Sequence, residues 1–422
     1  TGPRSVIVAL GFATTVAMWA IGYTCMTGPG LVVGEALFVI ELLAIVGGGF
    51  FAGKVLGSAK AGFWVGGVSA TVNLLIIGSL LSDGGGTAAA WILGLYGVSI
   101  VLGGFGAVVG CRLSTQRTLP SATSLFSIIT AATVFLLLIT GGLVTGLEAG
   151  LAVPDWPNSF GHNMLLYPLS EMTEGIYYEH AHRLYGMLVG LSSIALLVII
   201  FLHDRRTWVR LLMMALFVMV CIQGLMGGLR VTGTLTLDQE GLQPSVLLAI
   251  VHGVFGQLVF AGFCWLAVAT SQAWNKPEAR WSIGPAPCAL AVALFIQLVL
   301  GACYRPLQVP ATETTAAHHP MGPLVGHLSF SIVVMLLSVF VGFRAMKLAE
   351  HRLPKALGHS VLGFVGLQFF LGVGALGAVL MRQAGEFSIW EVIFTSAHQA
   401  NGALMLGTAV ALASLLIQKR PI

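Results

Sequence analysis

Four histidines within the apolar stretches of this sequence have the residue type and the spacing of ligands for an iron-bearing group. His182 and His252 are 70 residues apart, and His327 and His398 are 71 residues apart. The first pair precedes the second by 145 residues, counted from His182 to His327. A fixed offset of this kind indicates an internal repeat.

Glutamine follows the same repeat as histidine. Gln223 and Gln368 are also 145 residues apart, and each begins a Q-x-x-x-G pattern shortly before the second histidine of a pair. Gln297 begins the same pattern once more. We therefore expect residues 124–422 to form two four-helix units in tandem, with histidines in the even-numbered helices and Q-x-x-x-G in three odd-numbered ones. Units with an even number of helices share one topology, which predicts a parallel repeat.

Paired histidines on two helices of a bundle can ligate a planar cofactor from both of its faces. Haem is the natural candidate, because its iron takes axial imidazoles. Two other interpretations remain open: each histidine hydrogen-bonds a neighbouring helix, or several side chains hold a bare metal ion, for which only Glu179 adds a carboxylate. Arg230, Arg305 and Arg382 follow the outer ends of odd-numbered helices, where they can pair with haem propionates or form solvated helix ends.

The amino-acid composition indicates whether the helices that position these residues lie in water or in a lipid bilayer. Hydrophobic residues make up 57% of the 422 positions and charged residues only 9%, whereas an ordinary soluble domain has roughly a quarter charged residues. Apolar runs of about 20 residues suffice to cross the hydrocarbon core. We predict an all-α polytopic membrane protein with twelve such runs, at 5–27, 34–53, 62–82, 88–111, 124–147, 177–202, 208–230, 245–271, 283–304, 321–345, 357–382 and 389–417.

The positions of Lys and Arg predict the orientation, because basic residues near helix ends stay in the cytoplasm. All of the 20 Lys and Arg residues fall on one side of a twelve-helix alternation, except Arg183, Arg230, Arg305 and Arg382. That side is expected to be the cytoplasm and to hold both termini. The histidines then lie roughly 8–15 Å below the outer surface, at 1.5 Å per helical residue. The net charge of +4 follows from this topology and does not indicate a nucleic-acid partner.

Ionisable residues cluster in the stretch YYEHAHRLYG at 177–186. Glu179 and His182 are three residues apart and share a helix face, and a carboxylate at membrane depth is usually functional. The alternative role for Glu179 is an ion pair with Arg183, one helical turn further on. Arg183 can instead pair with a haem propionate. Helix geometry turns His180 away from His182, so we interpret His180 as a non-ligand.

These motifs resemble the heme A synthase family. Glu179, His182 and Arg183 look like the family's E-x-x-H-R element, and GLVTGLEAGLAVPDWPNSFG at 142–161 looks like its first helix end and P-D-W-P loop. The remaining family histidines are matched by His252, His327 and His398. The resemblance covers residues 124–420, and it implies eight helices in two tandem bundles related by pseudo-two-fold symmetry.

By this resemblance, His182 and His252 would hold heme O as substrate, and His327 and His398 would hold heme B as cofactor. Glu179 would be the catalytic carboxylate in the oxidation of a ring methyl of heme O to the formyl group of heme A. The resemblance also implies a bacterial inner membrane as the location. Expected partners are a heme O synthase, cytochrome oxidase assembly factors, an unidentified electron donor and the lipid bilayer, and a homo-oligomer is possible.

The chain departs from the family pattern in two places. Many bacterial members carry a cysteine pair flanking the loop signature, whereas Val153 and Ser159 stand at the similar positions here. Residues 1–120 form an additional four-helix region without histidine, followed by the substrate-haem unit at 121–275 and the cofactor-haem unit at 276–422. The extra region has three open roles: a partner surface, a fused module or a packing scaffold.

Two other functions remain open at this point. The first is a di-haem membrane cytochrome that carries electrons from quinol without modifying its haem. The second is a haem transporter or chaperone, although its histidine helices would then be expected to be broken at the midplane. Glu179 distinguishes the enzyme from the electron carrier, because a pure electron carrier needs no carboxylate beside the ligand.

Overall fold

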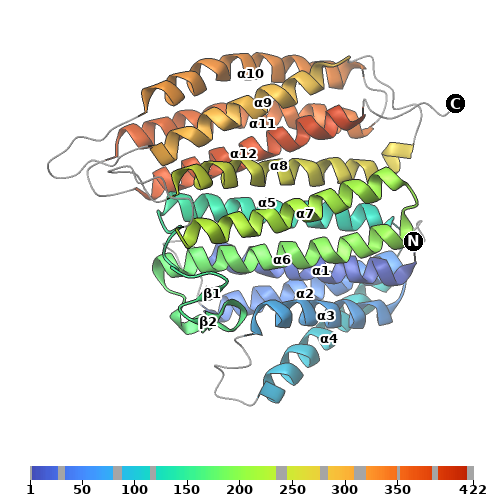
Figure 1. Cartoon of the computed structure of the whole chain (residues 1–422). Helices are drawn as coiled ribbons and strands as arrows, with labels where there is room; N and C mark the ends of the chain where they lie inside the picture. The colour runs from blue at the N-terminus through green and yellow to red at the C-terminus, as the bar shows by residue number, and fades with distance from the viewer. Residues whose placement is uncertain are drawn as a thin grey trace. The chain divides into compact units, whose positions relative to one another are not determined.

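The structure is a computed structural model. It describes residues 2–26, 34–78, 88–114, 120–233, 245–275, 284–307, 320–348, 352–382 and 388–415, and Figure 1 shows the course of the chain.

Long helices account for almost all of the described chain. Their bounds are α1 Pro3–Met26, α2 Gly34–Leu56, α3 Ala59–Ile76, α4 Ala88–Arg112, α5 Ala122–Gly146, α6 Glu174–His203, α7 Thr207–Val231, α8 Val246–Thr270, α9 Ala286–Tyr304, α10 Met321–Leu348, α11 Arg352–Leu380 and α12 Ile389–Ser414. Short elements are β1 Asn158–Ser159, β2 His162–Asn163, η2 Met164–Leu166, η3 Leu169–Glu171, η4 Gln272–Asn275 and η6 Arg305–Leu307. In lipid, only a helix or a closed barrel satisfies every backbone N–H and C=O group, which explains why such apolar runs become helices.

Eleven helices of the described residues are long and apolar enough to cross a membrane. The exception is α12, whose sequence includes Glu391, His398, Gln399 and Asn401, and these polar residues lower its mean hydropathy. The predicted all-α polytopic membrane fold with twelve helices is confirmed, and the chain is an integral membrane protein. The helix bounds match the predicted runs to within six residues, and the largest difference is at the end of α3.

The chain divides into two compact units, which we describe separately. Unit 1 comprises residues 1–136, 162–173 and 184–210, and unit 2 comprises residues 137–161, 174–183 and 211–422. The predicted boundaries at 120/121 and 275/276, and the pseudo-two-fold relation between two bundles, stay predictions.

Helices α1 to α4 pack against one another in unit 1. Small residues bring their backbones close together: a side chain at Gly49 on α2 would collide with the main chain of Gly103 on α4. Close approach through small residues is how membrane helices associate, since lipid tails are as apolar as leucine side chains. Trp19 on α1 also donates its indole N–H to the Asn73 side chain on α3, at 2.8 Å.

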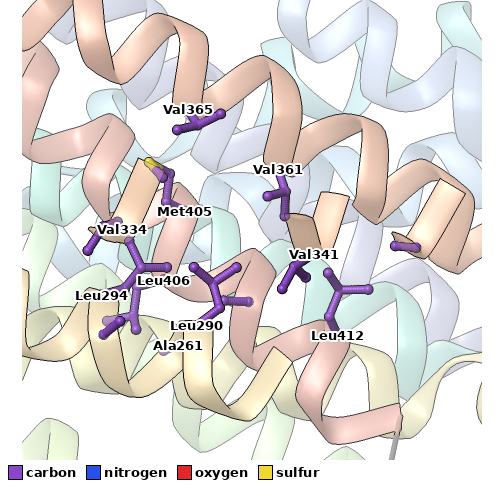
Figure 2. Packing of buried hydrophobic residues seen from close by; sticks show 13 residues of the cluster. Ala261, Leu290, Leu294, Val334, Val341, Val361, Val365, Met405, Leu406 and Leu412 are labelled. Atoms are coloured by element: carbon purple, nitrogen blue, oxygen red, sulfur yellow. The ribbon is translucent and has the colours of Figure 1, made fainter. Parts of the chain in front are cut away.

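In unit 2, α9 packs against α10, α10 against α11, α11 against α12, and α12 against both α9 and α8. Figure 2 shows the buried apolar side chains between these helices, which include Leu290, Val341 and Leu412. Leu290 and Val341 are 0% exposed and Leu412 is 1% exposed. This close packing holds the three helices that carry His252, His327 and His398.

Candidate haem sites

The structure brings the four predicted histidines together as two pairs, both within unit 2. His182 on α6 faces His252 on α8, with ring centroids 6.5 Å apart and ring planes at 78°. His327 on α10 faces His398 on α12, with centroids 6.1 Å apart and planes at 69°. These are the pairings that the spacing of 70 and 71 residues predicts.

Both pairs have the separation that a shared haem iron requires. An imidazole nitrogen binds a transition metal at roughly 2.0–2.1 Å, so two imidazoles on opposite sides of one ion have ring centres about 6 Å apart. Among the described residues, no three His, Cys, Asp or Glu side chains gather in one place. Two facing imidazoles without further protein ligands fit a haem, whose porphyrin supplies the other bonds to the iron.

A glycine of the preceding helix lies against each imidazole. A Cβ atom built on this glycine would lie between 2.9 and 3.3 Å from the histidine Cε1 atom, closer than an ordinary contact. The four facing pairs are Gly141 with His182, Gly227 with His252, Gly301 with His327, and Gly372 with His398. Glycine therefore leaves the space that each ring occupies.

The glutamines of the Q-x-x-x-G patterns hold the histidine helices. Each glutamine donates its Nε2–H to the main-chain carbonyl of the histidine on the next helix. The donor-acceptor distances are 2.7 Å for Gln223 and His252, 2.9 Å for Gln297 and His327, and 3.1 Å for Gln368 and His398. The repeated motif thus consists of an amide that fixes the histidine backbone and a glycine, one turn later, that accommodates its ring.

Glu179 and Arg183 form an ion pair on α6, beside the first histidine pair. Arg183 Nε lies 3.2 Å from Glu179 Oε1, and both side chains are 7% exposed. The guanidinium also donates to the carbonyls of Val153, Asp155 and Asn158, at 2.8, 2.7 and 3.0 Å. Of the five N–H donors of an arginine, four are therefore used within the protein. Arg183 joins the predicted catalytic carboxylate to the loop that carries the P-D-W-P motif.

Asp155 organises this loop from within. Its carboxylate accepts hydrogen bonds from the backbone N–H groups of Phe160 and Gly161, at 2.7 and 2.8 Å. Burial opposes ionisation of Asp155, but these two hydrogen bonds and the charge of Arg183 outweigh it and lower the pKa of the carboxyl. The indole of Trp156 lies against the backbone of Gly228 on α7, where a Cβ atom would collide with it.

His180 contacts the same loop and belongs to neither histidine pair. Its Nδ1 atom lies 3.1 Å from the Ser159 hydroxyl, and both residues are buried. Val153 is also buried, and its carbonyl accepts from Arg183. Many bacterial members of the family have a cysteine pair at the positions of Val153 and Ser159. Here hydrogen bonds from Arg183 and His180 on α6 hold the loop at these positions.

The three predicted outer arginines have different surroundings. Arg230, at the end of α7, is close enough to Glu179, His182 and His252 to act on them electrostatically. Its guanidinium lies beside Gly150, and its Nε atom is buried without a hydrogen-bond partner among the described residues. A buried, unsatisfied donor of this kind suits an anionic ligand group.

Arg305 and Arg382 instead share a buried carboxylate. Glu391 Oε1 lies 3.7 Å from Arg305 Nη1 and 3.5 Å from Arg382 Nη1, and the Glu391 side chain is 1% exposed. Arg382 also pairs with Glu148 Oε1 at 2.7 Å, and Arg305 donates to the Gly146 carbonyl at 3.1 Å. These contacts lie in unit 2 and connect the end of α5 with α9, α11 and α12.

Sequence reasoning missed three residues of these sites: Thr140, Glu148 and Glu391. Thr140 on α5 lies 3.0 Å from His182 Nδ1 through its hydroxyl. Glu391 is seven residues before His398, and its position at the start of α12 gave no sign of burial. Glu148 has a positive φ of 55°, uncommon for a residue other than glycine, at the turn that ends α5.

The fold and the two histidine pairs define a polytopic α-helical membrane protein with two candidate bis-histidine sites. Residues 124–309 match the sequence profile of the family described as "Cytochrome oxidase assembly protein" (COX15-CtaA). The heme A synthase of Beijerinckia indica subsp. indica is 25% identical over 334 residues, which cover 69% of this chain and 91% of that protein. The heme A synthase of Caulobacter vibrioides is 26% identical over 363 residues, covering 71% of this chain and 97% of that protein.

Over residues 124–309 the chain is therefore similar to this family, and over most of their length these heme A synthases are similar to it. The match begins at α5, so the additional region predicted at 1–120 lies outside the family profile.

Proposed function

We propose that this protein oxidises a ring methyl of heme O to the formyl group of heme A, for cytochrome oxidase biogenesis. The observation that carries the proposal is the buried Glu179 carboxylate, held by Arg183 on the same helix as His182. The match of residues 124–309 to the family profile and the similarity to heme A synthases support the same reaction.

We assign heme O to the first histidine pair and heme B to the second. Counted by the 145-residue offset, Leu324 and Leu328 stand on α10 where Glu179 and Arg183 stand on α6. The second pair therefore has no ionisable partner at these positions of its ligand helix. This difference supports chemistry at the first pair and electron transfer at the second.

The residues of the first site have separate tasks in this proposal. A haem iron held by His182 and His252 would supply the redox chemistry. With water as the oxygen donor, conversion of the methyl to the formyl group is a four-electron oxidation, in which –CH3 and H2O give –CHO, four protons and four electrons. The carboxylate of Glu179 would accept protons, and an external electron acceptor would take the electrons. Arg183 fixes that carboxylate through Nε, and Arg230 pairs with a propionate through the guanidinium that lacks a protein partner at Nε.

The proposal includes a location and partners. The location is a bacterial inner membrane, with both termini in the cytoplasm and both haem sites toward the outer face. A heme O synthase delivers the substrate, an electron carrier exchanges electrons with the heme B site, and oxidase assembly factors receive the product. Residues 1–120 offer α1 to α4 as the additional surface for such partners.

Co-expression with a heme O synthase, in cells that lack their own heme A synthase, tests the reaction. The haems extracted from the membranes are identified by mass spectrometry. The proposal expects heme A, together with any hydroxymethyl intermediate. If the purified protein binds two haems while heme O accumulates and neither oxidised form appears, the chain is not a heme A synthase. That result would instead support the di-haem electron carrier.

A further inference from the structure

The two pairs share a feature: one histidine of each pair has a hydrogen-bond partner at Nδ1. In the second pair, His327 Nδ1 lies 3.1 Å from the main-chain carbonyl of Gln297 on α9. A carbonyl oxygen only accepts, so Nδ1 carries the hydrogen and Nε2 keeps the lone pair that binds iron. The main chain of α9 thus fixes the tautomer of His327.

In the first pair, the Thr140 hydroxyl lies between the His182 ring and the corresponding main-chain carbonyl, which is that of Leu137. His182 Nδ1 lies 3.0 Å from Thr140 Oγ1, and Thr140 donates to the carbonyl of Leu137 at 2.9 Å. A hydroxyl has one hydrogen. Since the Leu137 carbonyl takes it, the Thr140 oxygen accepts from His182 Nδ1–H. His182 therefore has the same tautomer as His327, with Nε2 available for iron.

The repeat shows that this hydroxyl is an addition to a common arrangement. Leu137 precedes Gly141 by four residues, as Gln297 precedes Gly301, so the two carbonyls correspond. Leu300 stands on α9 at the position equivalent to Thr140. On α7 and α11 the equivalent residues are Met226 and Leu371. Thr140 alone among these four positions carries a hydrogen-bonding side chain.

The other histidine of each pair lies near the main chain of the glutamine on the preceding helix, Gln223 for His252 and Gln368 for His398. The Nδ1 atoms of His252 and His398 are buried and have no hydrogen-bond partner among the described residues. A hydrogen bond from Nδ1–H fixes the ring orientation of a metal-bound histidine and raises its basicity. Each pair therefore combines one imidazole with a hydrogen bond at Nδ1 and one without, although Nε2 of His398 lies 3.2 Å from Gln368 Nε2.

We propose that Thr140 is a positioning residue that orients His182 as a ligand of the substrate haem by accepting a hydrogen bond from Nδ1–H. This inference rests on the haem-binding part of the proposed function and does not depend on the oxidation of the methyl group. Because a side chain provides the anchor, the first site can be altered independently of the second, where the anchor is a main-chain carbonyl.

The test uses the full chain, purified with haem from cells that make heme O. Thr140→Val removes the hydroxyl and keeps the side-chain shape. We expect the haem of the first pair to dissociate about 10- to 100-fold faster, the range for lost outer-shell partners. Its reduction potential should rise, because a less basic imidazole stabilises ferric iron less. Thr140→Ser should restore both values, and the second haem should keep its potential.

Thr145→Val is the matched control on α5, because the Thr145 hydroxyl donates to the Gly141 carbonyl and contacts neither histidine. Protein with His327→Ala identifies which potential belongs to the first pair. Wild-type potential and haem retention in Thr140→Val, or an equal change at both haems, would overturn the role of Thr140. Wild-type protein that binds haem at the first pair but forms no heme A contradicts the proposed reaction and leaves this inference standing. Wild-type protein without haem at the first pair contradicts both.

Discussion

Arg183 Nε lies 3.2 Å from Glu179 Oε1, and through this contact one guanidinium links the predicted catalytic carboxylate to the loop at 153–161. Three further donors of Arg183 reach the carbonyls of Val153, Asp155 and Asn158. The order of the loop and the position of the carboxylate therefore depend on the same side chain.

Arg183→Lys should loosen the loop while keeping the positive charge. A lysine is a single ammonium group and cannot reach all of these acceptors in the fixed fork of a guanidinium. Losing one such bond costs about 1.5 kcal/mol, so hydrogen exchange of the amides at 158–161 should be at least about tenfold faster. Arg210→Lys is the control, because Arg210 bonds the carbonyls of Asp204 and Phe201. Equal exchange in Arg183→Lys and wild type would disprove this role.

Acidification should release the same loop through Asp155. The pKa of this carboxyl is lowered in the folded protein, because the N–H groups of Phe160 and Gly161 outweigh the effect of burial. Its contribution to loop stability is therefore complete above the ordinary pKa of aspartate and is lost as the pH falls through the lower, folded value. Loop exchange, corrected for its intrinsic pH dependence, should show this loss in wild type and should lack it in Asp155→Asn. A pH response that is the same in both proteins argues against Asp155.

The glycines that face the imidazoles predict a graded effect on haem binding. A Cβ atom at residue 372 would lie 3.0 Å from Cε1 of His398, so Gly372→Ala must displace the ring. We expect the second haem to bind roughly tenfold more weakly, measured by haem loss to an acceptor protein. Gly377→Ala on the same helix meets nothing within 4 Å and should retain haem as wild type does. Equal haem retention in Gly372→Ala and Gly377→Ala would show that the His398 ring does not need the space left by Gly372.

Glu391 should contribute more to stability than Glu148. Glu391 is 1% exposed and lies beside Arg305 and Arg382, whereas Glu148 is 34% exposed and pairs with Arg382 alone. Breaking a buried ion pair costs about 3–5 kcal/mol, and breaking an exposed one costs about 1 kcal/mol or less. Thermal unfolding in detergent should show a large loss of stability for Glu391→Gln and a small one for Glu148→Gln. Similar losses would mean that burial of Glu391 is energetically unimportant.

The sequence was informative where a pattern repeats. The spacing of the four histidines predicted both facing pairs, because these residues recur at one offset. Q-x-x-x-G indicated the repeat, but its hydrogen bonds to the histidine backbone became visible only in the structure. Thr140 could not be found in this way, since a single threonine is ordinary in an apolar helix and its contact with His182 depends on how α5 and α6 are rotated. The burial of Glu391 likewise depends on the arginines that follow α9 and α11. The roles of the histidines and of Glu179 stay predictions until haem is measured.

The most direct measurement is the haem composition of Glu179→Gln protein, co-expressed with a heme O synthase and compared with wild type. Glutamine keeps the size of the side chain and a hydrogen-bond acceptor for Arg183, but it cannot take up a proton at neutral pH. We expect the variant to retain both haems and to bind heme O with little or no heme A, while wild-type protein yields heme A. Heme A at the wild-type level from Glu179→Gln would show that the oxidation of the methyl group does not need the Glu179 carboxylate.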